Sequence, residues 1–352
     1  MEHQRLTRSR RGQRGVSLIE LMVSMTIGLV ILAALIVVYV GSRGSFRTSE
    51  SLDAVQERGR FAVDFLVRDL RQTSYLGCRS RSLSTDDETL FNITATPAVV
   101  LNTAADGIAA FEDGTGWTNP TSVARARGDV LQLMRVANQS APVTNHNQAA
   151  RTITVQNNAM GLRNGDIVMV GSCQHSMLFR VTNSPPTAMT PQVIEFKTTG
   201  AGPGGTAGNV TGVSVENLSP NLRPQAMRVM EVHYFIGNNA LGRPALYRSA
   251  SGVVEELVDN VEDMDLVFAI DNNADGLADG YARASGVVNW AQVISVRVSI
   301  VVVGDEDNVT TNAQTYAFRD TDGDGVPETQ TAPDRRLRQV FTSTVALRNR
   351  VL

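Results

Sequence analysis

The sequence predicts an α+β protein, with one long N-terminal helix followed by a globular head of antiparallel β-sheets. The run Leu21–Val40 contains no charged residue. Apolar residues then recur every three or four positions from Leu52 to Leu70, which is the spacing of one helix face. We therefore expect a helix over residues 16–75, packed on the head through its second half.

The first half of this helix is expected to cross a membrane over residues 18–40. The twenty residues Leu21–Val40 form a helix about 30 Å long, which matches the thickness of a bilayer core. Five arginines precede the run and only Arg43 and Arg47 follow it closely, which places the N-terminus on the cytoplasmic side.

The head, over residues 76–352, is expected to be β-rich. Short apolar runs alternate there with stretches rich in glycine, proline and asparagine, as in strands separated by turns. The expected strands are Asp129–Arg135, Asp166–Gly171, Met177–Thr182, Gln192–Lys197, Met227–Ile236, Met264–Ile270, Ala291–Val303 and Gln339–Arg348. We expect a single domain with two sheets; a division near Gly200–Pro220 is the alternative.

Composition indicates a folded protein without a basic surface. The chain has 352 residues, of which 42% are hydrophobic and 19% charged, with a net charge of -3. The first fifteen residues hold five arginines and one glutamate, so the remainder carries a net charge of about -7. An acidic remainder argues against nucleic-acid binding, which needs a basic face.

The residues around the start of the apolar run have an unusual order. A secretory signal is cleaved after its apolar region, whereas Gly15 stands before this one. Glu20 puts a carboxylate into the apolar segment, where insertion costs about 3 kcal/mol, so it needs a partner. The simpler alternative is a single-pass anchor with Glu20 at the level of the lipid headgroups.

The segment Arg11–Glu20 and the apolar run after it resemble the class III signal of type IV prepilins and pseudopilins. The resemblance implies that a prepilin peptidase removes residues 1–15 by cutting after Gly15. It also implies N-methylation of the new first residue, Val16, where the family more often has Phe or Met. Glu20 would then bind the amine of a neighbouring pilin during assembly, assisted by the nearby helix N-terminus.

Three further stretches are similar to the PilW family of minor pilins: residues 59–78, residues 165–181 and residues 335–349. The resemblance implies a minor pilin that helps to initiate assembly of the type IV pilus and forms part of its tip complex. Implied partners are other minor pilins, the major pilin, a tip adhesin and the prepilin peptidase. The protein would lie in the inner membrane with its head in the periplasm, and later in the pilus on the cell surface.

Two acidic loops have the spacing of calcium-binding loops. Residues 271–279 match D-x-N-x-D-G and residues 320–328 match D-x-D-x-D-G, each with an acid at position nine. The candidate ligands are Asp271, Asn273, Asp275, Asp279, Asp320, Asp322, Asp324 and Glu328. Neither loop has the glutamate at position twelve that an EF-hand requires. The alternative is that Asp, Asn and Gly serve only as turn residues.

The chain has two cysteines, Cys78 and Cys173, too few for a zinc site and too far apart for a redox pair. In an oxidising compartment they can form one disulfide; two buried free thiols are the alternative. No nucleophile elbow or H-E-x-x-H helix is present, and we expect no enzyme.

Two other functions stay open from the sequence. One is a minor pseudopilin of a type II secretion system, because the N-terminal signal is shared between the two machines. The other is a calcium-binding periplasmic protein or adhesin on a plain membrane anchor, which predicts an uncut Gly15 and a dispensable Glu20.

Overall fold

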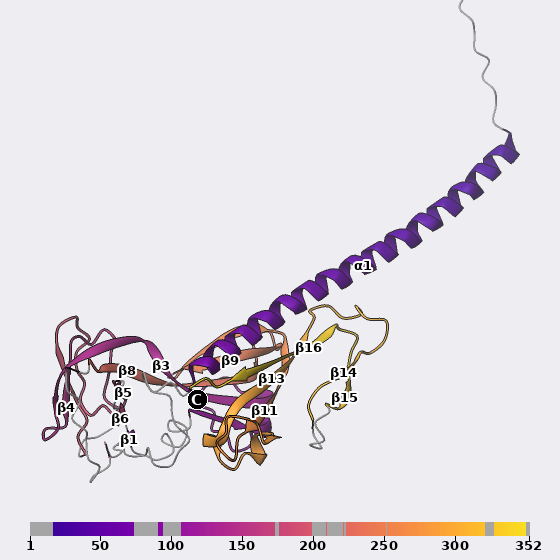
Figure 1. Cartoon of the computed structure of the whole chain (residues 1–352). Helices are drawn as coiled ribbons and strands as arrows, with labels where there is room; N and C mark the ends of the chain where they lie inside the picture. Colours follow the sequence, from indigo (N-terminus) through magenta and orange to yellow (C-terminus); the bar gives the residue numbers. More distant parts are fainter. Residues whose placement is uncertain are drawn as a thin grey trace, which may run out of the picture. The chain divides into compact units, whose positions relative to one another are not determined.

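In a computed structural model the chain forms two compact units, one up to Ser51 and one from Leu52 onward. A single helix, α1 (Leu18–Gln72), provides the end of the first unit and the beginning of the second (Figure 1). The residues that the structure describes are 17–73, 91–93, 107–172, 176–198, 209, 221, 223–250, 252–320 and 327–349.

The second half of α1 is amphipathic, as the sequence spacing predicted. Its buried stripe consists of Val55, Gly59, Ala62, Leu66 and Leu70, separated by steps of three or four residues. The helix ends in a turn at which the Thr73 N–H donates to the Leu70 carbonyl, so the last turn tightens.

The head contains a ten-stranded sheet. Its strands are β1 (Phe91–Ile93), β2 (Ile108–Phe111), β3 (Arg125–Asn147), β4 (Thr152–Val155), β5 (Ile167–Gly171), β6 (Ser176–Arg180), β7 (Gln192–Glu195), β8 (Gln225–Asn238), β9 (Pro244–Ala250) and β10 (Val253–Asp259). All pairs are antiparallel except β1 with β6. The order is β1-β6-β5-β8-β3-β4-β7, with β2 paired to β3 and with β9 and β10 following β8.

A second sheet has four antiparallel strands in the order β12-β11-β13-β16. These are β12 (Gly280–Ala282), β11 (Val261–Ile270), β13 (Val293–Val303) and β16 (Arg338–Ala346). The short pair β14 (Thr315–Ala317) and β15 (Thr329–Thr331) lies in the connection from β13 to β16. The short 3-10 helices are η2 (Glu112–Gly114), η5 (Ala284–Gly286) and η6 (Trp290–Gln292).

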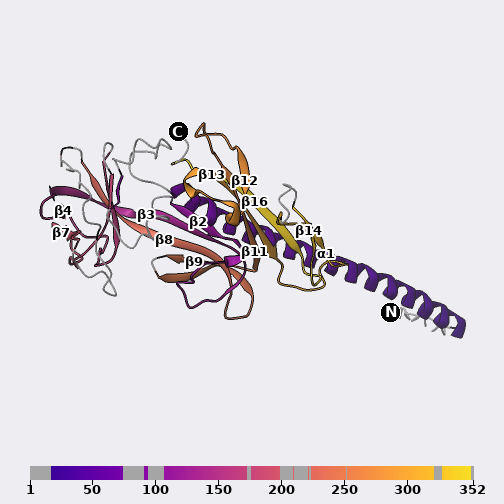
Figure 2. The same cartoon turned by 90° about the horizontal axis from the view of Figure 1, so that it is seen from below.

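Strands β3 and β8 are long enough to take part in two separate cores (Figure 2). The larger core joins the buried stripe of α1 to β2, the first part of β3, the second part of β8, β9 and the four-stranded sheet. A distal core lies between the far ends of β3 and β8 and strands β4 to β7, and contains Phe179 and Phe196. The predicted α+β fold, with a long helix and antiparallel sheets, is thereby confirmed.

Candidate assembly site on the N-terminal helix

The first turn of α1 is capped by Ser17. Its Oγ accepts a hydrogen bond of 3.2 Å from the Glu20 N–H, and its carbonyl accepts one of 3.1 Å from the Leu21 N–H. Ser17 therefore satisfies amides that a helix N-terminus leaves without intrahelical partners. The sequence contains a signal for this cap, because Ser17-Leu18-Ile19-Glu20 has the S-x-x-E spacing of a capping box.

Glu20 lies in this first turn and is exposed. Its carbonyl accepts a hydrogen bond from the Ser24 hydroxyl, a contact that stays inside the helix. Among the described residues, the Glu20 carboxylate has no hydrogen bond or ion pair, so it is free to bind a group from outside the chain.

The apolar side chains that follow Glu20 cover every face of the helix. The large apolar residues from Leu18 to Val40 are all at least 51% exposed, and Leu18 reaches 79%. No part of the first unit is available to bury this surface, since the helix is its only described element. A helix that is apolar on all sides is covered either by lipid or by other apolar helices.

By length and composition, α1 is able to cross a membrane, and its most apolar window is not buried inside the protein. The first half of α1 thus combines a surface that requires lipid or helix neighbours with a carboxylate near its beginning that has no partner among the described residues. The predicted processing residues, Gly15 and Val16, lie outside the described residues.

Two regions of the chain match models of known protein families. Residues 10–36 match the model of the prokaryotic N-terminal methylation motif, and residues 233–349 match that of type IV pilus-assembly protein W. The C-terminal third of the chain is thus similar to the PilW family. Together, the two matches support a minor pilin of the type IV pilus. No curated protein and no solved structure matches the chain.

The two matched regions coincide with structural features already described. The N-terminal match includes Ser17, Glu20 and most of the apolar half of α1. The PilW match begins within β8 and continues through β16, so it contains the whole four-stranded sheet. Of the three PilW-like stretches in the sequence, the C-terminal one, residues 335–349, falls inside the match.

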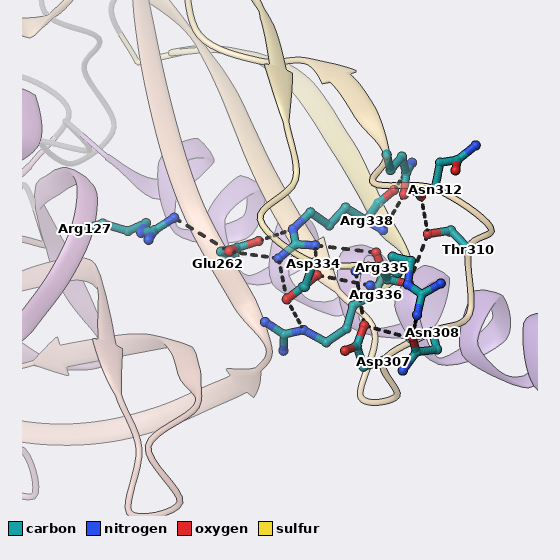
Figure 3. Close-up of polar contacts among 11 residues, drawn as sticks. Arg127, Glu262, Asp307, Asn308, Thr310, Asn312, Asp334, Arg335, Arg336 and Arg338 are labelled. Carbon is teal, nitrogen blue, oxygen red and sulfur yellow. Dashed lines mark hydrogen bonds and ion pairs between the residues drawn. The ribbon is translucent and has the colours of Figure 1, made fainter.

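A buried ion pair connects strands β11 and β16 of the four-stranded sheet, inside the region matched by the PilW model (Figure 3). Arg338, whose side chain is completely buried, donates to Glu262 at 2.6 Å and to Asp334 at 2.5 Å. Hydrogen bonds from Arg338 hold the pKa of Asp334 well below its usual value. Because one buried guanidinium is matched by two carboxylates, this contact fixes the start of β16 against β11.

A second buried cluster contains more acid than base. Asp129 of β3 accepts hydrogen bonds from the Asp113 and Leu266 N–H groups, and Arg283 lies 3.6 Å from Asp129 and 3.2 Å from Asp265. Burial raises the pKa of Asp129 to about 6. Sequence reasoning did not find this cluster, because its members come from separated segments that show no spacing pattern.

The loop over residues 271–279 is wound around its first residue. The Asp271 carboxylate accepts bonds from the N–H groups of Asn273, Ala274, Asp275 and Gly276 at 2.7 to 3.3 Å. The Asn273 amide nitrogen lies 3.3 Å from Asp275 and 3.4 Å from Asp279. The four predicted ligands are therefore neighbours, with an amide N–H placed between two carboxylates.

The other predicted cation loop is described only at its ends. Asp320 is buried, and the Glu328 N–H and carbonyl bond to Arg319 and Phe318, so the two ends of the loop meet. Asp322 and Asp324 lie outside the described residues, as do Cys78 and Cys173. Within the described parts of the chain, no group of three or more His, Cys, Asp or Glu is arranged to hold a metal ion. Calcium binding and the disulfide stay predictions.

Proposed function

We propose that this minor pilin helps to initiate assembly of the type IV pilus and takes a place in its tip complex. The observation that carries the proposal is the construction of α1. Its first half exposes apolar side chains on all sides and one free carboxylate, while its second half is built into a two-core head. The distal core adds bulk beyond the helix-packed core, which hinders the repeated stacking expected of a major subunit.

The assembly step depends on the N-terminus. Cleavage after Gly15 creates a positively charged amine at Val16, and N-methylation keeps that charge. Glu20 of one subunit then binds the amine of a neighbouring pilin, which offsets the cost of a carboxylate in an apolar environment. The surrounding apolar side chains pack against neighbouring helices and leave the lipid.

Before assembly, the protein is placed in the inner membrane through the first half of α1. The arginines of the leader hold residues 1–15 in the cytoplasm, where the prepilin peptidase acts. The head is then in the periplasm and reaches the cell surface with the pilus. The partners are other minor pilins, the major pilin and a tip adhesin, and the protein is a structural subunit without enzymatic activity.

We further propose calcium as a ligand of the loops at 271–279 and 320–328. The ligand set consists of carboxylate and amide oxygens, which suit a hard cation. The support is the winding of the first loop around Asp271, with Asn273, Asp275 and Asp279 beside one another. Calorimetry with the full chain and Asp275→Asn tests this: heat at millimolar calcium that the variant lowers supports it, and no heat contradicts it.

Gene deletion followed by counting of surface pili tests the assembly role. The deletion strain is expected to lose most of its pili, and the wild-type gene to restore them. A Glu20→Ala gene should fail to restore them although the protein is processed and inserted, whereas Glu57→Ala, on the exposed face of the second half, should restore them. Unchanged piliation in the deletion strain would contradict the proposal.

A further inference from the structure

Gly59 lies where α1 packs directly on the four-stranded sheet. It is buried against the Phe341 ring of β16, and a Cβ at this position would fall 2.2 to 2.4 Å from three ring atoms. Real side chains do not come so close, so any residue larger than glycine forces the ring or the helix to move. Gly59 thus forms a notch in the helix surface, and Phe341 fills it.

This notch interrupts the otherwise regular stripe of side chains through which α1 contacts the core of the head. The other buried residues of the stripe, Val55, Ala62, Leu66 and Leu70, recur at helical spacing. A shift of α1 by one turn would present a similar stripe to the core, at little cost in buried area. The same shift would bring Val55 or Ala62 against Phe341, where there is no room for a Cβ. The pair Gly59–Phe341 therefore selects one axial position of the helix.

Arg58, the neighbouring residue, ties the helix to both sheets at the same level. Its Nε lies 2.9 Å from Asp259, the last residue of β10, and its Nη2 lies 2.7 Å from Asp305, which follows β13. Asp305 also accepts bonds from Arg243 and Asn260. Burial alone would raise the pKa of Asp305, but the bonds from Arg58 and Asn260 hold it below its usual value.

A second tie lies eleven residues further along, about 16 Å up the helix axis. The buried Asp69 accepts a 2.7 Å bond from the Tyr234 hydroxyl, and Arg135 and Arg248 lie 3.6 and 3.5 Å away. The notch allows only one axial position, and the two ties, one beside it and one at a separate height, prevent both sliding and rotation of the helix on the head.

We infer that Gly59 and Arg58 are positioning residues for pilus assembly, which fix the register of the head on α1 so that it meets the heads of neighbouring subunits. This inference rests on the assembly role proposed above. It requires that a change of register stop assembly even when the protein is cleaved, inserted and folded.

The test substitutes Gly59 and Phe341 in full-length genes, each of which is placed in the deletion strain. Gly59→Ala should lose surface pili while the mature protein stays at its wild-type level in the membrane. Gly59→Ala combined with Phe341→Leu, which makes room for the added methyl group, should restore pili. The matched control is Phe179→Leu in the distal core, chosen to lower the melting temperature of the detergent-solubilised protein by the same amount.

Loss of pili with Gly59→Ala, rescue in the double variant and normal pili with Phe179→Leu support the inference. Equal loss in Gly59→Ala and Phe179→Leu would overturn it, because stability alone would then explain the defect. Normal pili with Gly59→Ala would overturn it as well. If the deletion strain itself keeps its pili, it is the proposed function that fails, so the two failures are distinguishable.

Arg58 offers an independent comparison within one helix turn. Arg58→Leu removes the bonds to Asp259 and Asp305 and should lose pili, whereas Arg58→Lys keeps the charge and should restore part of them. Arg60→Leu is the control, since Arg60 is exposed and makes no ion pair among the described residues. Equal piliation in the Arg58→Leu and Arg60→Leu strains would contradict a positioning role.

Discussion

The two halves of α1 have the same backbone geometry and opposite relations to their surroundings. Between Leu18 and Val40 the large apolar side chains are at least half exposed on every face, and the Glu20 carboxylate among them has no partner in the described part of the chain. From Leu52 to Gln72 an apolar stripe is buried against two sheets, and of the large apolar side chains only Leu52 and Phe61 are exposed. The pattern of side chains, rather than helix propensity, thus decides which half joins the head and which half is left for lipid or other subunits.

The two halves of α1 also differ in how their carboxylates are paired. In the second half, the buried carboxylate of Asp69 is surrounded by a tyrosine hydroxyl and two arginines from the head. In the first half, Glu20 has no such partners among the described residues. A carboxylate with hydrogen-bond and ion-pair partners inside the chain stabilises the fold. A carboxylate without such partners is expected to bind a second molecule.

Removal of Asp69 should produce the largest loss of stability. Asp69→Ala leaves Tyr234 and Arg135 without their carboxylate, while Arg248 keeps Glu255. Breaking a buried ion pair in this way costs about 3–5 kcal/mol. Urea unfolding of the detergent-solubilised protein, followed by tryptophan fluorescence, measures the change. Asp64→Ala, on the exposed face of the same helix, is the control and should cost less than about 0.5 kcal/mol.

Truncation of a leucine should distinguish the two halves directly. Leu66 is fully buried in the larger core, so Leu66→Ala is expected to lower the free energy of unfolding by about 2–5 kcal/mol. Leu29 is 66% exposed, and Leu29→Ala should leave unfolding of the head unchanged in the same measurement. Similar losses for the two variants would mean that the first half of α1 also contributes to the core of the head.

The stability of the head should respond to pH through Asp129. Burial raises the pKa of Asp129 from 3.8 to about 6, so the folded state binds a proton more tightly than the unfolded state. This contribution to stability is present in full below about pH 4 and is lost as the pH rises through about 6. A shift of two pKa units corresponds to at most about 3 kcal/mol.

The comparison with Asp129→Asn isolates this effect, because other carboxylates titrate in both proteins. From pH 4 to pH 7 the wild-type protein should lose stability relative to the variant. The opposite trend would show that hydrogen bonds to Asp129, and not its burial, dominate the pKa. Hydrogen exchange in the first turn of α1 should be unaffected by the substitution.

The smallest expected effect concerns the start of α1. Ser17→Ala removes the acceptor for the Glu20 N–H and should destabilise the first turn by about 0.5–2 kcal/mol. Hydrogen exchange followed by mass spectrometry should show faster exchange only at the first amides of the helix. Ser45→Ala, in the middle of α1, should leave exchange at these amides unchanged.

Much of the fold followed from periodicity in the sequence. The long helix and the eight expected strands are present, since burial on one face imposes a regular spacing on each segment. Strand β3 extends far beyond the predicted Asp129–Arg135, because its second half belongs to the distal core. Strand β10 was missed because Glu255 and Glu256 on an exposed edge conceal its pattern. The other strands that the sequence did not predict are β1, β2, β4, β9, β12, β14 and β15.

Some residues of the candidate site could likewise be selected from the sequence, and others could not. Glu20 could be selected from the sequence, since a single charge beside an uncharged run is a local signal, and its role in assembly stays a prediction. The Gly59 notch and the partners of Asp69 could not be selected in this way, because Phe341 and Tyr234 lie more than 160 residues further along the chain and no spacing rule connects them to the helix. Contacts of this kind depend on how the sheets are placed against α1, which the sequence pattern does not contain.

The mature N-terminus tests the central claim most directly. Mass spectrometry of membrane fractions, from cells with and without the prepilin peptidase, determines where the chain begins. We predict a methylated chain beginning at Val16 that is absent when the peptidase is absent. An intact chain beginning at Met1 in both preparations would contradict the account and leave α1 as a plain membrane anchor.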